Sequence, residues 1–83
     1  MMELTVRLFG PMRRAVDRTE LTVAVAELPV TCAALRRRLT EIEPRLADLL
    51  PGCRFAVNCQ FAEESRTLCP TDEISLLGFV SGG

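Results

Sequence analysis

The sequence predicts an α+β fold, in which one main helix packs across one face of a mixed sheet. Two observations predict it. Apolar and polar residues alternate with the period of a strand in the first 26 residues and again after residue 53, and between these regions the apolar spacing becomes helical. A chain of 83 residues with 48% hydrophobic residues has room for one small core, so we expect a single domain.

Two strands are predicted at the start of the chain. Over residues 3–9 and again over residues 20–26 every second residue is apolar, as expected for strands with one buried face. Gly10 and Pro11 end the first run, and a polar connection joins it to the second. Strands joined this closely predict an antiparallel hairpin.

The main helix is predicted after Pro29. Thr31 is suited to the N-cap position, and Cys32 follows it as a small residue able to pack at the start of a helix. Apolar residues then recur at helical spacing as far as the next proline, which ends the helix; they are Leu35, Leu39 and Ile42. Residues 45–50 predict a short second helix before the turn at Pro51 and Gly52.

The second half of the chain predicts two further strands and a short one. Residues 54–61 alternate, with Phe55, Val57, Cys59 and Phe61 on the buried face. A short strand is predicted around residues 66–68, and the last strand spans residues 73–80. The order strand, strand, helix, strand, short strand, strand matches the β-grasp, or ubiquitin-like, plan, with a domain over residues 1–80 and a flexible Gly-Gly tail over residues 81–83.

The composition argues against a self-contained enzyme. The chain has no His, Lys, Tyr or Trp, and these include most of the side chains that act as general acids and bases or activate a nucleophile. The cysteines at 32, 53, 59 and 69 form no C-x-x-C pair and have no His beside them, so we expect no metal site and no bound cofactor.

Charge and hydropathy make nucleic acid and membrane unlikely partners. The net charge is −1, and the ten basic residues are spread along the chain. The consecutive arginines at 36–38 and the acids Glu63 and Glu64 are interpreted as solvated groups without a function. No apolar run is long enough to span a membrane, and no signal peptide precedes the first strand, so we expect a reducing, cytoplasmic location.

The chain ends in Gly82 and Gly83 directly after an apolar strand. Terminal glycines alone are weak evidence, because chain ends are often disordered. At the end of this fold they gain meaning, since residues without a Cβ can pass through a channel too narrow for side chains. The sequence therefore predicts that the Gly83 carboxylate is the reactive group and that Gly82 allows it to enter a partner's site.

A docking surface is predicted beside this tail. In the predicted sheet Phe9, Leu77 and Phe79 lie on the face opposite the core, and in a β-grasp the first and last strands are neighbours. Such an exposed apolar cluster marks a partner surface. With Val80 and Ser81, which lead into the tail, these residues are the predicted partner interface.

The chain resembles the small subunit of molybdopterin synthase, a ubiquitin-like sulfur carrier. The resemblance covers nearly all of the chain, and it is carried by the first strand ending in Leu8-Phe9, by Arg13, by the segment Ala56-Val57-Asn58, by the acidic turn Asp72-Glu73 and by the ending Val80-Ser81-Gly82-Gly83. The chain departs from the family at Leu77-Gly78-Phe79, where Phe-Pro-Pro is common.

The resemblance implies a cycle of activation and sulfur transfer at Gly83. An E1-like adenylyltransferase would use ATP to adenylate the carboxylate, and sulfur would then replace the adenylate to give a thiocarboxylate. The tail would enter the large subunit of molybdopterin synthase, in a heterotetramer, and donate sulfur to cyclic pyranopterin monophosphate. The acid–base lysines of the family belong to the large subunit.

Other interpretations share the same tail. Sulfur carriers for thiazole synthesis, cysteine synthesis or tRNA thiolation have the fold and the two glycines. Ubiquitin-like conjugation to other proteins is a further possibility, as is a β-grasp interaction module whose terminal glycines are incidental. The sequence leaves open which of these applies.

Overall fold

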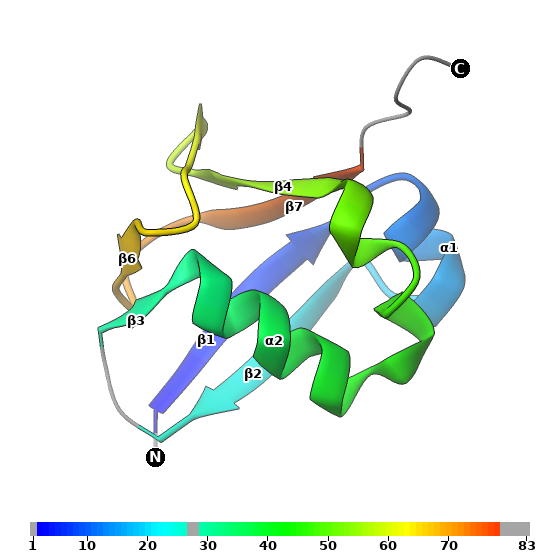
Figure 1. Ribbon diagram of the computed structural model, residues 1–83, viewed down its shortest axis with the longest axis horizontal. Coiled ribbons are helices and arrows are strands. Elements are labelled where there is room, and N and C mark those ends of the chain that lie inside the picture. Colours follow the sequence, from blue (N-terminus) through cyan, green and yellow to red (C-terminus); the bar gives the residue numbers. More distant parts are fainter. Residues whose placement is uncertain (1, 27–28, 79–83) are drawn as a thin grey trace.

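The predicted layers are confirmed in a computed structural model, which describes residues 2–26 and 29–78 (Figure 1). Five strands form a mixed sheet in the order β2-β1-β7-β4-β5, and the helix α2 lies across one face of it. Two short strands, β3 (Val30–Thr31) and β6 (Thr67–Leu68), pair separately. The core fills the space between α2 and the sheet. Within the described residues no helix covers the opposite face of the sheet, which we call the open face.

The first two strands form the predicted antiparallel hairpin. β1 (Met2–Leu8) pairs with β2 (Glu20–Val25) along its length. The alternation of the sequence is reproduced in the burial, because Leu4, Val6 and Leu8 point into the core while the residues between them are exposed. These residues fold as a strand because a period of two places one apolar set on one face.

The connection between these strands is a helix, which the sequence analysis missed. α1 (Pro11–Val16) begins at a proline, whose fixed φ suits the first helical position, and its Met12 and Val16 are both buried. These two apolar residues are four apart and therefore share one helix face. The prediction of a plain polar connection was wrong because a helix of six residues offers too few apolar positions for a visible period.

α2 (Cys32–Ile42) begins and ends close to its predicted limits. The side chain of Thr31 accepts a hydrogen bond from the backbone N–H of Ala34 at 3.1 Å, which is the predicted N-cap. Cys32, Leu35 and Leu39 are fully buried, as expected, whereas Ile42 in the last turn is 38% exposed. The apolar stripe of the helix thus reaches the core only as far as Leu39.

The predicted second helix over residues 45–50 is instead two short 3-10 turns. These are η1 (Pro44–Leu46) and η2 (Leu50–Gly52), each with a proline near its start. Leu46 and Leu50 are buried from this segment. Prolines close together limit backbone N–H donors, so single turns form where the apolar spacing alone suggests a helix.

The predicted strand over residues 54–61 is a hairpin. β4 (Cys53–Val57) is followed by a two-residue turn and by β5 (Gln60–Phe61), which pairs back on β4. Asn58 and Cys59 both have positive φ, 53° and 69°, the combination that a type I′ hairpin turn requires. Cys59 and Phe61 were therefore wrongly predicted to be buried: both are exposed, because the turn reverses the chain.

The last described strand occupies the middle of the sheet. β7 (Ile74–Gly78) runs parallel to β1 and antiparallel to β4, so the first and last strands are neighbours as predicted. Ile74 and Leu76 are buried, also as predicted. Positions 79 and 80 of the predicted strand lie outside the described residues. Over residues 2–26 and 29–78, no helix is long and apolar enough to cross a membrane.

Candidate functional site

The segment that leads to the predicted tail starts from a firmly held strand. β7 is hydrogen-bonded on both sides, and Gly78 at its end is the register partner of Cys53 at the start of β4. A strand paired on both edges cannot peel away without breaking two ladders of hydrogen bonds. β7 is therefore held on both edges as far as Leu76, and at Gly78 it is held by β4.

α1 packs closely against this end of β7. A Cβ built on Gly78 would lie 3.2 Å from Pro11 Cγ and 3.3 Å from Met12 Sδ, closer than ordinary van der Waals contact. Gly78 thus lets the short helix approach the strand. Gly78, one of the positions at which the chain departs from the family pattern, is thus the residue against which the unpredicted helix α1 packs.

Of the predicted docking residues the structure describes two, Phe9 and Leu77. Leu8 of β1 pairs with Leu76 of β7, and both are buried, so the residues that follow them turn to the open face. Phe9 is 39% exposed and Leu77 is half-buried. Phe79, Val80, Ser81, Gly82 and Gly83, the other predicted site residues, lie outside the described residues.

The open face carries a second aromatic side chain that the sequence analysis assigned to the core. Phe61 is 55% exposed and pairs with Ala56, which in turn pairs with Ser75 of β7. The hairpin of β4 and β5 therefore brings Phe61 to the same face as Leu77. The signal for this was Asn58, a residue that tolerates positive φ, at the centre of a short alternating run.

Two arginines flank these rings. The guanidinium carbon of Arg54 lies 4.8 Å from the centre of the Phe61 ring, and that of Arg7 lies 5.8 Å from the centre of the Phe9 ring. Both distances are within the range of cation–π attraction. Arg54 is also the register partner of Leu77. We call Phe9, Leu77, Phe61, Arg7 and Arg54 the open-face patch. In the strand order β1-β7-β4-β5, Leu77 and Arg54 lie side by side between the two aromatic residues, and Leu77 directly precedes the last residue of β7.

The interpretation of Arg36 and Glu64 as solvated groups was wrong. Its side chain is only 21% exposed and forms a two-pronged ion pair with Glu64, both N···O distances being 2.9 Å. It also donates to the carbonyls of Leu50 and Cys53, at 3.1 Å for the latter. Neither Arg36 nor Glu64 is a freely solvated group. Arg36 joins α2 to η2 and the start of β4, and its ion pair with Glu64 joins α2 to the segment after β5.

These contacts shift the ionisation of the pair. The hydrogen bonds from Arg36 lower the pKa of the Glu64 carboxyl below its ordinary value and raise the pKa of the guanidinium. A second carboxyl, that of Asp72, has its pKa lowered by the backbone N–H of Cys69 and by the Asn58 amide, which links the β4–β5 turn to the turn before β7. Both carboxylates are occupied in holding turns in place.

The thiols offer no activated nucleophile among the buried positions. Burial raises the pKa of both the Cys32 and the Cys53 thiol, so each stays protonated at neutral pH. The Cys53 thiol donates to the carbonyl of Leu49 at 3.0 Å. No group of three or more Cys, Asp and Glu side chains able to hold a metal ion occurs within residues 2–26 and 29–78.

The fold and this site define the class of protein. It is a small ubiquitin-like β-grasp domain, and its central strand β7 ends beside the open-face patch. Its side chains include none of the usual catalytic bases His, Lys and Tyr. A family model described as the ThiS family matches residues 6–83, and the chain belongs to this family of sulfur-carrier fold. No curated protein matches the chain.

Solved structures support the assignment of the fold. The complex of subunits 1 and 2 of molybdopterin-converting factor from Helicobacter pylori 26695 contains a chain that is 30% identical, with a TM-score of 0.67 over 99% of this chain and 100% of that one. Small archaeal modifier protein 1 from Haloferax volcanii aligns with a TM-score of 0.81 at 19% identity, over 99% of this chain and 100% of that one.

The corresponding protein from Methanosarcina acetivorans aligns with a TM-score of 0.75 at 24% identity, over 100% of this chain and 98% of that one. At these identities the two archaeal proteins show the fold alone. The β-grasp plan predicted from the order of the elements is thus confirmed by proteins of closely similar length.

Proposed function

We propose that this chain is the sulfur-carrying small subunit of a molybdopterin synthase, with the Gly83 carboxylate as the group that carries sulfur. The observation that carries the proposal is the placement of the open-face patch beside the end of β7, five residues before Gly83. The 30% identical chain solved in complex with a second subunit supports a large-subunit partner over the other sulfur pathways.

The proposed chemistry takes place at one carbon atom. A carboxylate oxygen of Gly83 attacks the α-phosphorus of ATP in an activating enzyme, and pyrophosphate leaves. Hydrosulfide, released by a sulfur donor, then attacks the carbonyl carbon, and the bond to AMP breaks to leave a thiocarboxylate. In the large subunit the sulfur is transferred to cyclic pyranopterin monophosphate, water supplies oxygen, and the carboxylate is regenerated for another cycle.

The catalytic groups for these steps come from the partners. The chain contributes no His, Lys or Tyr, and the buried thiols Cys32 and Cys53 are kept protonated by desolvation. Its own part is to present the tail. Five residues beyond Gly78 reach at most about 17 Å when extended, at about 3.3 Å each, which is enough to enter a buried site.

The open-face patch is the surface on which we place both partners. Exposed aromatic and arginine side chains are the residue types that dominate binding energy at protein interfaces. Phe61 and Arg54 extend the surface beyond the residues predicted from the sequence, on the β4–β5 side. A partner seated there holds the end of β7 and hence the start of the tail.

Intact-mass measurement tests the proposal. The chain, co-purified from its native cell, should show Gly83 as its last residue and a fraction with one oxygen replaced by sulfur. A cognate activating enzyme should catalyse ATP–pyrophosphate exchange with the full chain, and a variant that lacks Gly83 should be inactive while unfolding at the same temperature. Absence of Gly83-dependent exchange would show that the terminal glycines are incidental, as in an interaction module.

The molecule that accepts the sulfur from Gly83 determines which biosynthetic pathway the chain serves. The thiocarboxylated chain, mixed with the large subunit, should convert cyclic pyranopterin monophosphate to the dithiolene product. Co-purification with a thiazole synthase, or with enzymes of cysteine synthesis or tRNA thiolation, and no conversion of the pterin, would assign the same tail chemistry to one of those pathways instead.

A further inference from the structure

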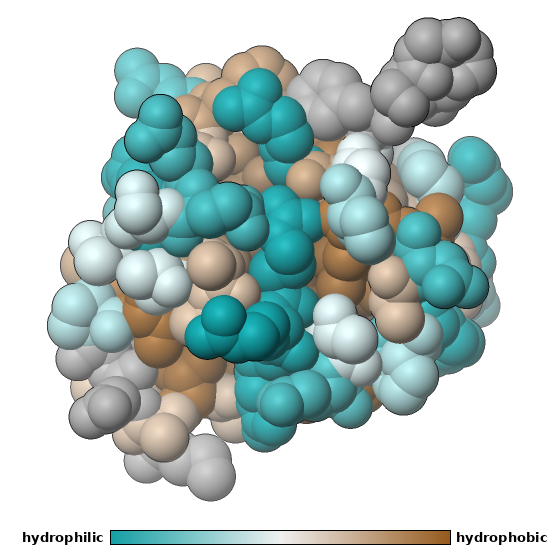
Figure 2. All heavy atoms as spheres, in the orientation of Figure 1, coloured by the Kyte–Doolittle hydropathy of each residue, from teal (hydrophilic) through white to brown (hydrophobic). Residues whose placement is uncertain are grey.

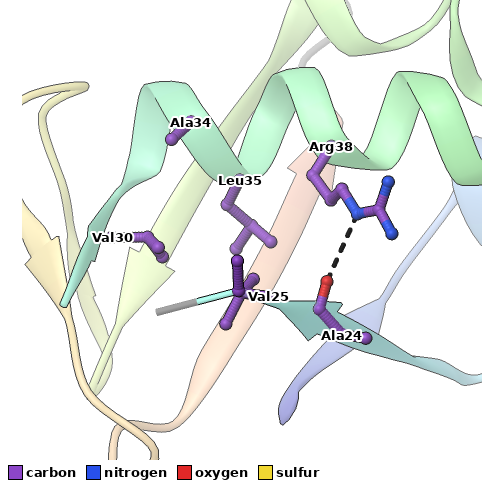
Figure 3. Close-up of a pocket in the computed structure, with 7 residues that line it drawn as sticks. Ala24, Val25, Val30, Ala34, Leu35 and Arg38 are labelled. Carbon is purple, nitrogen blue, oxygen red and sulfur yellow. Dashed lines mark hydrogen bonds between the residues drawn. The ribbon is translucent and has the colours of Figure 1, made fainter. Parts of the chain in front are cut away.

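A groove runs between α2 and β2, well away from the open-face patch. Its volume is about 460 Å³, and it is lined by residues of β2, of the bend after it, of β3 and of the first turns of α2: Ala24, Val25, Ala26, Val30, Ala34, Leu35 and Arg38 (Figure 3). Val25 and Leu35 form the floor, since both are buried in the core. Figure 2 shows hydrophobic surface open beside the hydrophilic band over α2. An apolar side chain entering from solvent would contact mainly apolar atoms.

The groove runs along the edge of the main sheet. β2 is the terminal strand of the order β2-β1-β7-β4-β5 among the described residues. The Leu8 N–H donates to the Thr19 carbonyl, and bonding to the partner alternates along an antiparallel pair. Leu21, Val23 and Val25 therefore bond to β1, whereas Thr22 and Ala24 point their backbone N–H and C=O groups outward.

One of these outward groups is held by a side chain. Arg38 Nε donates to the Ala24 carbonyl at 3.2 Å, which agrees with the outward direction derived from the ladder. The same guanidinium donates to Glu41 at 3.3 Å, and the Arg38 side chain is 44% exposed. Arg38 of α2 thus lies at the end of a mainly apolar groove, beside the edge of β2. The backbone groups of Thr22 and the N–H of Ala24 also point outward along this edge.

We propose that this groove binds an extended peptide segment of a partner protein, which adds to the edge of β2 as a further strand. Its alternate apolar side chains enter the groove, and its acidic residue pairs with Arg38. The backbone of the peptide replaces the guanidinium at the Ala24 carbonyl, which frees Arg38 to take the carboxylate. Strand addition of this kind obtains affinity from the main chain and specificity from pockets for alternate side chains.

A peptide of this chemistry fits the site better than a second copy of the chain. Symmetric pairing of two β2 edges would displace two Arg38 side chains from their carbonyls and bring two cationic α2 surfaces together, since Arg37 is also exposed. An acidic peptide displaces one guanidinium and gains an ion pair with it. Charge and hydrogen bonding together thus favour the acidic peptide.

The location gives the groove a role separate from the tail. Ala24 pairs with Glu3 at the start of β1, whereas β7 pairs with β1 near its other end, at Leu8. Five residues of strand correspond to about 17 Å. The groove is also on the α2 side of the sheet and not on the open face. A peptide bound there leaves the open-face patch and the end of β7 accessible, so that a third protein can be held while the tail is in use.

Binding is tested by NMR titration of the labelled chain with a synthetic peptide. In this peptide valine or isoleucine alternates with threonine over six positions, and two aspartates follow. We expect amide shift changes confined to residues 20–26 and 33–38, with none in residues 74–78. A peptide with lysines in place of the aspartates should bind about tenfold more weakly, as expected for the loss of a charge-assisted hydrogen bond.

Matched variants separate the two parts of the proposal. Arg38→Glu should weaken binding of the aspartate peptide at least about tenfold, while Arg37→Glu, which changes the net charge equally on the neighbouring residue, should alter it less than about twofold. Thr22→Pro removes an outward N–H and should also weaken binding, whereas Thr22→Ala keeps this donor and should not.

Proline is tolerated at such an edge, and an unchanged unfolding temperature of Thr22→Pro checks that the strand persists. No shift changes at millimolar peptide would overturn the proposal, as would changes centred on the open-face patch. Concentration-dependent changes in β2 without any peptide would replace it with self-association. None of these outcomes bears on the chemistry at Gly83.

Discussion

At the scale of single residues, Arg36 contacts more separate parts of the chain than its position in an arginine run suggests. It donates to Glu64 in the turn after β5, to Leu50 in η2 and to Cys53 at the start of β4, and its guanidinium lies 5.4 Å from the centre of the Phe55 ring. Arg37 next to it is exposed. The two arginines have the same charge and differ in what they touch.

Arg36→Ala should therefore lower the free energy of unfolding by about 2 kcal/mol, because two backbone carbonyls lose their donor at about 1 kcal/mol each. Arg37→Ala should change it by less than about 0.5 kcal/mol. Urea denaturation of the two variants beside the wild type measures both. Equal effects of the two substitutions would show that Arg36 is a solvated residue after all.

Glu64 predicts a pH dependence with a definite sign. Its pKa is lowered in the folded chain from the ordinary 4.5, so the folded state gains stability while the carboxylate is charged and loses it as pH falls through the folded pKa. The wild type should be more stable than Glu64→Gln above about pH 5, by less than about 1 kcal/mol because the side chain is half exposed.

This advantage should shrink as pH falls below 4.5, because the carboxyl of the unfolded chain binds its proton first, and it should be lost once pH has fallen through the lower pKa of the folded chain. Thermal unfolding of both proteins between acidic and neutral pH measures the difference. A gap that widens toward acid would contradict the assignment of the Arg36 ion pair as the cause.

Cys59 occupies a backbone conformation that favours glycine. Its φ is 69° in the turn between β4 and β5, and its side chain is exposed. Cys59→Gly should stabilise the fold by about 0.5 to 1 kcal/mol, because the left-handed conformation costs an L-residue more than it costs glycine. The control is Cys69→Gly, an exposed residue without positive φ, which should not gain stability in the same denaturation experiment.

At the scale of elements, the strands and the main helix followed from periodicity because each has enough apolar positions to show its period. β1, β2 and α2 lie within a residue or two of their predicted limits. The misses are the short elements. α1 has two buried residues, and the reversal at Asn58 falls inside a run that keeps alternating across it. Both elements depend on the backbone preferences of a few residues, Pro11 at the start of α1 and Asn58 in the turn, and the spacing of apolar residues does not reveal these preferences.

The same distinction applies to the candidate site. The positions of Phe9 and Leu77 were predictable because they depend on strand period and on which strands are neighbours. Phe61 depends on the turn that precedes it, and Arg36 on contacts to residues 14 to 28 positions away in the sequence. Contacts of that range follow from the folded packing and leave no trace in a local pattern.

The junction of α1 and β7 gives a prediction at this scale. Gly78→Val should lower the free energy of unfolding by about 1 to 2 kcal/mol, because its Cβ already comes within 3.3 Å of both Pro11 Cγ and Met12 Sδ before the methyl groups are added. Leu77→Val, on the other face of the same strand, should have a smaller effect. NMR shifts at residues 11–16 should follow the first substitution and not the second; unchanged shifts would mean that the helix does not rest on Gly78.

At the scale of the whole molecule, the open-face patch and the groove should behave as independent surfaces. If the proposed large subunit docks on the patch, Phe61→Ala should weaken its binding by about tenfold or more, with little change in stability because Phe61 is 55% exposed. Arg38→Glu should leave this affinity within about twofold. Calorimetric titration of the large subunit with each variant measures both, and a similar loss in the two would show a single continuous interface.

The pairing of β1 with β7 has a consequence for how the protein is made. A chain that stops before Ile74 lacks the strand between β1 and β4, so its sheet falls into two separate hairpins that share no backbone hydrogen bond. Pairing of strands that are far apart in the sequence is also slow, because the entropy of loop closure is lost before the contacts compensate for it. A nascent or truncated product without β7 therefore has neither a completed sheet nor an open-face patch, and under the proposed function it should not be a substrate for an activating enzyme.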